Sequence, residues 1–191
     1  MTARALFGVL QARLYAQRRV VLSTCAGALV AGLIAPASLA GPVLFCSLLG
    51  IVLALSQSPG VHPHLDRCEQ SAPLFGRELA RGKALVPCIA AALTVLVYMT
   101  GQLLGGAPIP PLTLLIALGS TVAGTLVALS ATMRRGVLRA LYVLLAAATS
   151  LVAFALVEVG RSVPGALAFC AVVAFLALRQ YGETLARYDP I

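Results

Sequence analysis

The polar residues of this chain gather in one internal stretch, HPHLDRCEQSAPLFGRELARGK, which runs from residue 62 to residue 83. It holds both histidines, three of the six acidic residues and four of the fourteen basic residues, between long runs of Ala, Leu and Val. These residue types permit metal binding, acid–base catalysis or contact with another protein. The spacing of the side chains decides how well each function fits.

Metal binding and catalysis both fit this spacing poorly. His62, His64 and Cys68 allow two or three metal ligands, but no second cluster in the sequence completes such a site. Acid–base catalysis would need a pocket that excludes water around the acidic residues. The segment stands in open solvent between apolar runs, so we interpret it as a solvated face that contacts a protein partner.

The stretch GRELARGKA, at 76–84, has only a superficial likeness to a phosphate-binding loop. Such a loop needs four residues between its glycines, and a Ser or Thr after the lysine to bind magnesium. Here five residues separate Gly76 from Gly82, and Ala84 follows Lys83. The sequence therefore argues against nucleotide binding by this motif.

The composition predicts a membrane protein. The chain has 191 residues, of which 60% are hydrophobic and 10% charged, and its mean hydropathy is +0.98. A soluble domain would carry about a quarter charged residues. The formal net charge of +8 does not indicate nucleic-acid binding, because the basic residues lie between apolar runs.

Six apolar runs predict six transmembrane helices, although several are shorter than the ~20 residues that cross a bilayer core. A short run either extends through its uncharged flanks or lies in a thinned or water-facing region. The expected fold is therefore an all-α polytopic membrane protein. The runs cover residues 20–35, 40–56, 84–100, 112–132, 137–158 and 163–178.

The basic residues predict how these helices are oriented. With six spans, thirteen of the fourteen Lys and Arg residues fall on one side of the membrane, and Arg161 alone falls on the other. Positive residues favour the cytoplasmic side, so both termini are expected there. Four of the thirteen precede the first span, four separate spans two and three, three separate spans four and five, and two follow span six.

Residues 1–19 predict a helix of a different kind, which is amphipathic and lies in the membrane interface. Phe7, Leu10 and Leu14 recur at helical spacing on one face, and Arg19 lies on the other. The expected interfacial helix precedes the first span and lies on the cytoplasmic side.

Residues 20–191 form the expected transmembrane domain, with a cytoplasmic loop at 57–83. Small residues recur in the spans, as in the GxxxG pair Gly101 and Gly105, which predicts close helix packing within or between subunits. The span interiors hold no Asp, Glu, Lys, Arg or His, so a coupling ion would find no ligand there. Three functions stay open: a permease driven by a separate energy source, a scaffold or channel-like protein, and a lipid-acting enzyme.

Four segments carry a resemblance to a known family: RALFGVLQARLYAQRR, AGPVLFCSLLGIVLALS, CEQSAPLFGRELARGKAL and GTLVALSATMRRGVLRALYVLL. In this order they resemble the opening helix, the second span, the coupling loop and the fourth and fifth spans of the permease of a type-2 ABC exporter. More narrowly, the chain is similar to the membrane-embedded permease of the cytochrome c maturation haem-exporter system.

The resemblance implies that two copies of the chain pair, and that each docks on a separately encoded ABC ATPase subunit that binds ATP and magnesium. The chain itself would bind no cofactor and hold no catalytic residue. A short helix at 66–79 would transmit ATP-driven closure to the spans. The resemblance also implies the bacterial inner membrane and export of a hydrophobic or amphiphilic substrate, linked to haem or cytochrome c maturation. The residues implied in coupling are Asp66, Arg67, Glu69, Gln70, Arg77, Glu78, Arg134 and Arg135.

Overall fold

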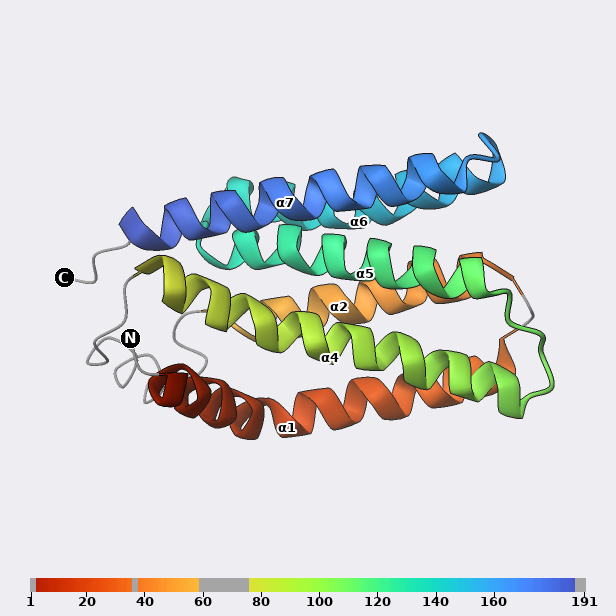
Figure 1. Ribbon diagram of the computed structural model, residues 1–191, viewed down its shortest axis with the longest axis horizontal. Helices are drawn as coiled ribbons and strands as arrows, with labels where there is room; N and C mark the ends of the chain where they lie inside the picture. Colours follow the sequence, from red (N-terminus) through yellow and green to blue (C-terminus); the bar gives the residue numbers. More distant parts are fainter. Residues whose placement is uncertain (1–2, 36–37, 59–75, 188–191) are drawn as a thin grey trace.

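The computed structural model describes residues 3–35, 38–58 and 76–187, and every regular element in this part of the chain is helical. Helices that follow one another run in opposite directions and form one elongated bundle (Figure 1). Their order is α1 (Ala3–Ile34), the π-helical turn η1 (Gly41–Phe45), α2 (Cys46–Leu55), α4 (Gly76–Leu104), α5 (Pro111–Thr132), α6 (Gly136–Glu158) and α7 (Val163–Arg187).

Five helices contain a segment that is long and apolar enough to cross a membrane, as in a multi-pass membrane protein. All six predicted spans lie in helices of the described part of the chain, and five of these helices are long enough to cross a membrane. The exception is the second span, Gly41–Leu55, which has five π-helical and ten α-helical residues. It rises about 22 Å, which is short of a ~30 Å hydrocarbon core, so a sixth transmembrane helix stays a prediction. The five segments are Gln11–Ile34, Gly82–Leu104, Pro111–Thr132, Gly136–Glu158 and Val163–Leu185.

The connections between helices alternate between the two ends of the bundle. Both termini, the end of α2 and the α5–α6 connection lie at one end, which we call the basic end (Figure 1). The α4–α5 and α6–α7 connections lie at the opposite end. Among the basic side chains that the structure describes, only Arg161 lies at the opposite end. This agrees with the predicted charge separation; which end faces the cytoplasm stays a prediction.

Proline and glycine set the limits of the later helices. α5 begins at Pro111, after Pro110 in an extended conformation with φ −65° and ψ 134°. Gly106 and Gly136 have φ values of +79° and +59°, in the left-handed region that favours glycine. They lie where the chain reverses before α5 and before α6, so these two turns depend on glycine.

α5 is the central helix of the bundle. Its residues from 123 to 132 are all buried, and it packs against α2, α4, α6 and α7. The hydroxyl of Thr125 donates to the carbonyl oxygen of Thr121 at 2.6 Å, one turn earlier. The hydroxyl of Thr132 donates to the carbonyl oxygen of Leu129, also at 2.6 Å. These local bonds let polar side chains lie inside an apolar bundle without partners on other helices.

Glycine permits a close contact between α1 and α4. A Cβ atom at Gly32 would collide with the carbonyl oxygen of Tyr98. A Cβ atom at Gly101 would lie 2.6 Å from the carbonyl oxygen of Leu29. The predicted GxxxG pair therefore packs within the chain, against α1, and its small residues let the two backbones approach each other.

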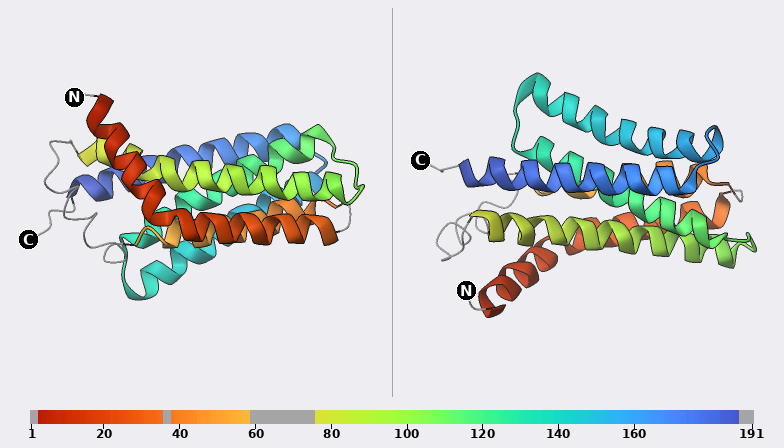
Figure 2. Two further views of the ribbon diagram at one scale, coloured as in Figure 1. Left: turned by 90° about the horizontal axis from the view of Figure 1, so that it is seen from below. Right: turned by 45° about the horizontal axis from the view of Figure 1, so that its top comes forward.

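α1 is continuous from Ala3 to Ile34, and its first turns point away from the bundle (Figure 2). Phe7 and Tyr15 have 67% and 66% of their surface exposed on these turns. The sequence predicts a separate helix at 1–19, whereas the structure joins the described part of it to the first span without a break. An interfacial position for these turns stays a prediction.

Candidate functional site

Two side chains from α1 hold the end of α2, just before the predicted coupling segment. Arg13 Nη1 donates to Gln57 Oε1, and Gln17 Nε2 donates to Ser56 Oγ at 3.2 Å. Arg13 and Gln17 are almost fully buried, with 3% and 1% of their surface exposed. The end of α2 is therefore fixed to α1 by polar contacts inside the bundle.

A third helix, α6, also contacts the end of α2. Arg139 Nη2, near the start of α6, donates to Ser58 Oγ at 3.2 Å. This pair is exposed, so it is the outer part of the set. We call the whole set the α2 anchor; its members are Arg13, Gln17, Ser56, Gln57, Ser58 and Arg139.

The periodicity of α1 explains why two polar residues are buried in the anchor. Arg13, Gln17, Thr24, Ala28 and Gly32 are all buried, and their spacings of four and seven place them on one helix face. That face packs against α4 over its apolar half. Sequence reasoning missed the first two residues, because it treated Arg13 only as one of the charges before the first span. The shared spacing was the signal that could have found them.

The anchor contains two buried polar atoms without a partner. Gln17 Oε1 and Gln57 Nε2 have no hydrogen bond within the part of the chain that the structure describes. A buried polar atom left unpaired costs about 1–3 kcal/mol. One atom is an acceptor and the other is a donor, on helices that already touch.

The predicted coupling residues fall largely outside the described part of the chain. α4 begins at Gly76, so the backbone of Arg77 and Glu78 belongs to its first turn. Within the described ranges, no three His, Cys, Asp or Glu residues are close enough to hold a metal ion. The residues that lie outside those ranges are Asp66, Arg67, Glu69 and Gln70, together with the metal-site candidates His62, His64 and Cys68.

Arg134 and Arg135 lie at the basic end, in the connection between α5 and α6. The guanidinium carbon of Arg134 is 5.9 Å from the centroid of the Tyr142 ring, and this arginine is half-buried. Arg135 is exposed and has an extended backbone, with φ −123° and ψ 157°, before α6. The structure thus brings both arginines to the end of the bundle where α2 and its anchor lie. Their predicted contact with an ATPase stays a prediction.

The described part of this site offers hydrogen bonds and positive charge, and its six anchor residues include no carboxylate, thiol or imidazole. Such a set can fix one helix relative to others and can pass a movement between them. It does not hold the paired groups that general acid–base or nucleophilic chemistry requires.

Comparisons with known proteins identify no relative of this chain. No protein-family model, no curated protein and no solved structure matches it.

Proposed function

We propose that the chain is the permease subunit of an ATP-driven exporter of the ABC type. The α2 anchor is the observation that supports this function best. It connects the start of the 57–83 loop to α1 through Arg13 and to α6 through Arg139. A partner that moves this loop would move the ends of three helices together, and a permease needs such coupling to tilt its spans.

In this proposal, residues 66–79 dock on a separate ATPase subunit, and Arg134 and Arg135 make a second contact with it. ATP and magnesium stay in the partner, and the chain contributes no catalytic residue. The mixed charges of the segment set the register of docking more than its affinity. The proposed substrate is hydrophobic or amphiphilic, and the resemblance to a haem-exporter permease makes a substrate of cytochrome c maturation the first to test.

We also propose that two copies of the chain pair through α1 and α6, as the family resemblance implies. Both helices contact α2. Leu22 and Val30 on α1, and Leu141 and Leu144 on α6, are exposed large apolar side chains that a partner copy would cover. Cysteines placed at Leu22 and Leu144 should form disulfide-linked dimers in membranes. A monomer bound to a single ATPase subunit would contradict this part of the proposal.

Glu69→Lys tests the docking segment. The tagged full-length permease should retain its ATPase partner during purification, and the variant should lose it while still inserting into the membrane. If the carboxylate is desolvated at the contact, the loss is about 1–3 kcal/mol, which corresponds to an increase in Kd of about 5-fold to 150-fold. Glu183→Lys is the matched control, since Glu183 is an exposed acidic residue on α7, outside the loop.

Three outcomes would contradict the proposed function or its docking segment. If no ATPase co-purifies with the wild-type chain, a scaffold or channel-like protein is the better description. If Glu69→Lys and Glu183→Lys weaken ATPase binding equally, the contact is one of general charge and not of the loop. If His62→Ala and His64→Ala abolish function while Glu69→Lys has no effect, the metal-site hypothesis replaces the docking segment.

A further inference from the structure

A groove of about 380 Å³ lies between α6 and α7, with α5 as its floor. Leu145, Val152 and Leu176 line it and are exposed by 48%, 41% and 55%, so the groove opens sideways, where the surrounding medium is lipid in a membrane-spanning bundle. The docking segment at 66–79 does not line this opening, although Arg134, proposed as a second ATPase contact, lies beside its lining residue Tyr142. The groove is therefore separate from the docking segment.

The wall of the groove is apolar in its chemistry although it contains hydroxyl groups. Thr149 Oγ1 donates to the carbonyl oxygen of Leu145 at 2.8 Å, and Ser130 Oγ donates to the carbonyl oxygen of Leu126 at 3.4 Å. Because these donors are used within their own helices, the wall presents hydrocarbon to whatever fills it. Its natural occupant is an alkyl chain.

The length of the groove matches one leaflet of a bilayer. Along α7 it extends from Phe169 to Gln180, which is about 16 Å at 1.5 Å per residue. The hydrocarbon core of a bilayer is ~30 Å thick, so one leaflet contributes about half of that. The groove therefore fits the length of one acyl chain that enters it from the basic end of the bundle.

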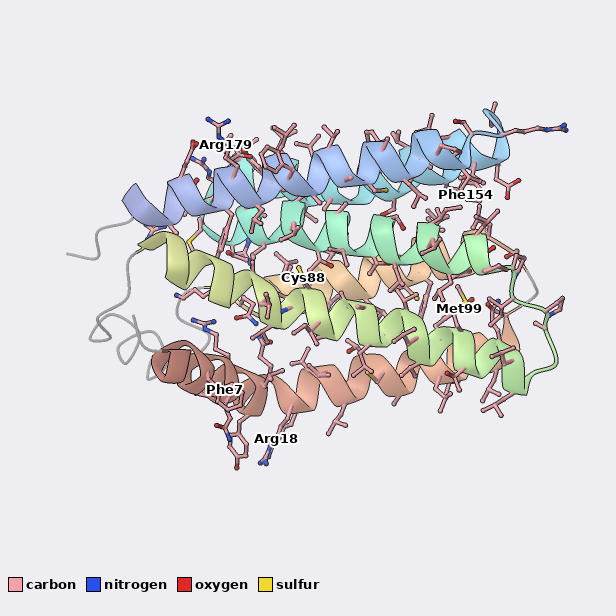
Figure 3. All side chains as sticks on the ribbon, viewed as in Figure 1. Phe7, Arg18, Cys88, Met99, Phe154 and Arg179 are labelled. Atoms are coloured by element: carbon pink, nitrogen blue, oxygen red, sulfur yellow. The ribbon has the colours of Figure 1, made fainter. Side chains whose placement is uncertain are left out.

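The basic end of the groove is polar and positively charged. Gln180 Nε2 donates to the hydroxyl of Tyr142 there, and the guanidinium carbon of Arg134 lies 5.9 Å from the Tyr142 ring. Arg179 is the next residue to Gln180; it pairs with Glu183 at 3.0 Å and is 69% exposed. Figure 3 shows Arg179 at the basic end of α7, pointing away from the bundle. Even with Glu183 counted, the nearby charge is positive, which favours an anionic head group.

We propose that this groove is a binding site for an anionic phospholipid. One acyl chain lies between α6 and α7, and the phosphate lies beside Arg134 and Arg179 at the level of the head groups. The zwitterionic lipid with the same chains fits the apolar part equally well but gains less from the two arginines. The lipid is a resident of the site, and its binding requires neither an ATPase nor an exported substrate.

Photocrosslinking in nanodiscs tests the site with the full-length protein and a phosphatidylglycerol that carries a photoreactive acyl chain. We expect crosslinks on α6 and α7 that unlabelled phosphatidylglycerol competes away better than phosphatidylcholine. Ala148→Phe fills the groove and should reduce crosslinking several-fold. Ala155→Phe is the control, because it lies two turns further along the exposed face of α6 and does not line the groove. If Ala148→Phe fails to fold, Leu176→Trp takes its place, since Leu176 is an exposed lining residue.

The preference of the groove for an anionic head group can be tested separately. Arg134→Gln and Arg179→Gln should each reduce the preference for phosphatidylglycerol over phosphatidylcholine by up to about fivefold, which corresponds to about 1 kcal/mol per basic residue near a membrane surface. Arg161→Gln, at the opposite end, should leave the preference unchanged. Equal competition by the two lipids in the wild type would overturn the anionic site. The absence of lipid crosslinks on α6 and α7 in the wild type would overturn the site itself.

Discussion

Arg13 is a charged residue with only 3% of its surface exposed, and its guanidinium contacts the end of another helix. Burial of a guanidinium is costly unless hydrogen bonds and opposite charges compensate for it. We infer that its main contribution is to specify where α2 ends relative to α1, more than to add stability. Gln17 likewise contributes more to the position of α2 than to stability, because it donates to Ser56 but leaves its own oxygen unpaired.

Arg13→Leu should lower the free energy of unfolding by about 1–3 kcal/mol, because it leaves Gln57 Oε1 buried without this donor. The measurement is thermal unfolding of the purified protein in detergent. Arg18→Leu is the matched control. Arg18 is exposed and lies 4.1 Å from the Tyr15 ring centroid, a contact that contributes about 0.5–1 kcal/mol.

The double variant Arg13→Leu with Gln57→Leu measures whether these two side chains are energetically coupled. Replacing both partners of a buried hydrogen bond by apolar groups is nearly neutral, so the double variant should recover much of the stability that Arg13→Leu loses. If the effects of Arg13→Leu and Gln57→Leu simply add, the two side chains are not coupled, and the anchor does not transmit movement through them.

At the scale of residues, the sequence predicted charge and position better than burial. The net excess of arginine at one end was readable because each arginine lies beside an apolar run. The burial of Arg13 was not readable from the sequence. It depends on where Gln57, forty-four residues later, lies after the chain has turned back. A local sequence pattern does not indicate a contact between residues so far apart in the chain. The helical spacing shared by Arg13 and Gln17 gave the only hint.

At the scale of helices, Gly32 determines how closely α1 approaches α4. Gly32→Ala should lower the melting temperature, because its Cβ atom would collide with backbone of Tyr98 and overpacking costs about 1–3 kcal/mol. Gly27→Ala, earlier on the same helix, meets no atom within 4 Å. It should be neutral or stabilise the helix by up to about 1 kcal/mol. Thermal unfolding of the two variants side by side measures the difference, and equal melting temperatures would show that the α1–α4 contact is looser than described.

Helix lengths show which spans were predicted correctly from the sequence and which one is shorter than expected. Long apolar runs were enough to locate five spans, although Gly27, Gly32 and Pro87 lie inside them. The second run ends early. Ser56 Oγ donates to the carbonyl oxygen of Leu53 and Ser58 Oγ to that of Leu55, both at 2.7 Å, which closes α2 before the polar segment. Serine is weakly informative in a sequence, since it is tolerated both inside and at the ends of membrane helices.

At the scale of the whole molecule, the separation of basic residues predicts that the basic end faces the cytoplasm. In a cysteine-free background, cysteines at Ser38 and Ala107 should react with a membrane-impermeant maleimide added to intact cells. A cysteine at Gln70 should react only after the membrane is opened. Both Ser38 and Ala107 lie at the opposite end of the bundle, so they form a matched pair on different connections. Labelling of Gln70 from outside would overturn the orientation and, with it, the docking of a cytoplasmic ATPase.

The packing partners of the short α2 have a consequence for the synthesis of the protein. α1 packs mainly on α4 and touches α2 little, whereas α2 packs mainly on α5 and α4. The first two elements to leave the ribosome therefore do not form a stable hairpin with each other, and each lacks its main partner until α4 and α5 have been translated. We expect the translocation machinery to retain α2 until then. A nascent chain cut after residue 58 should leave α2 extractable from the membrane, and a chain extended through α5 should hold it there.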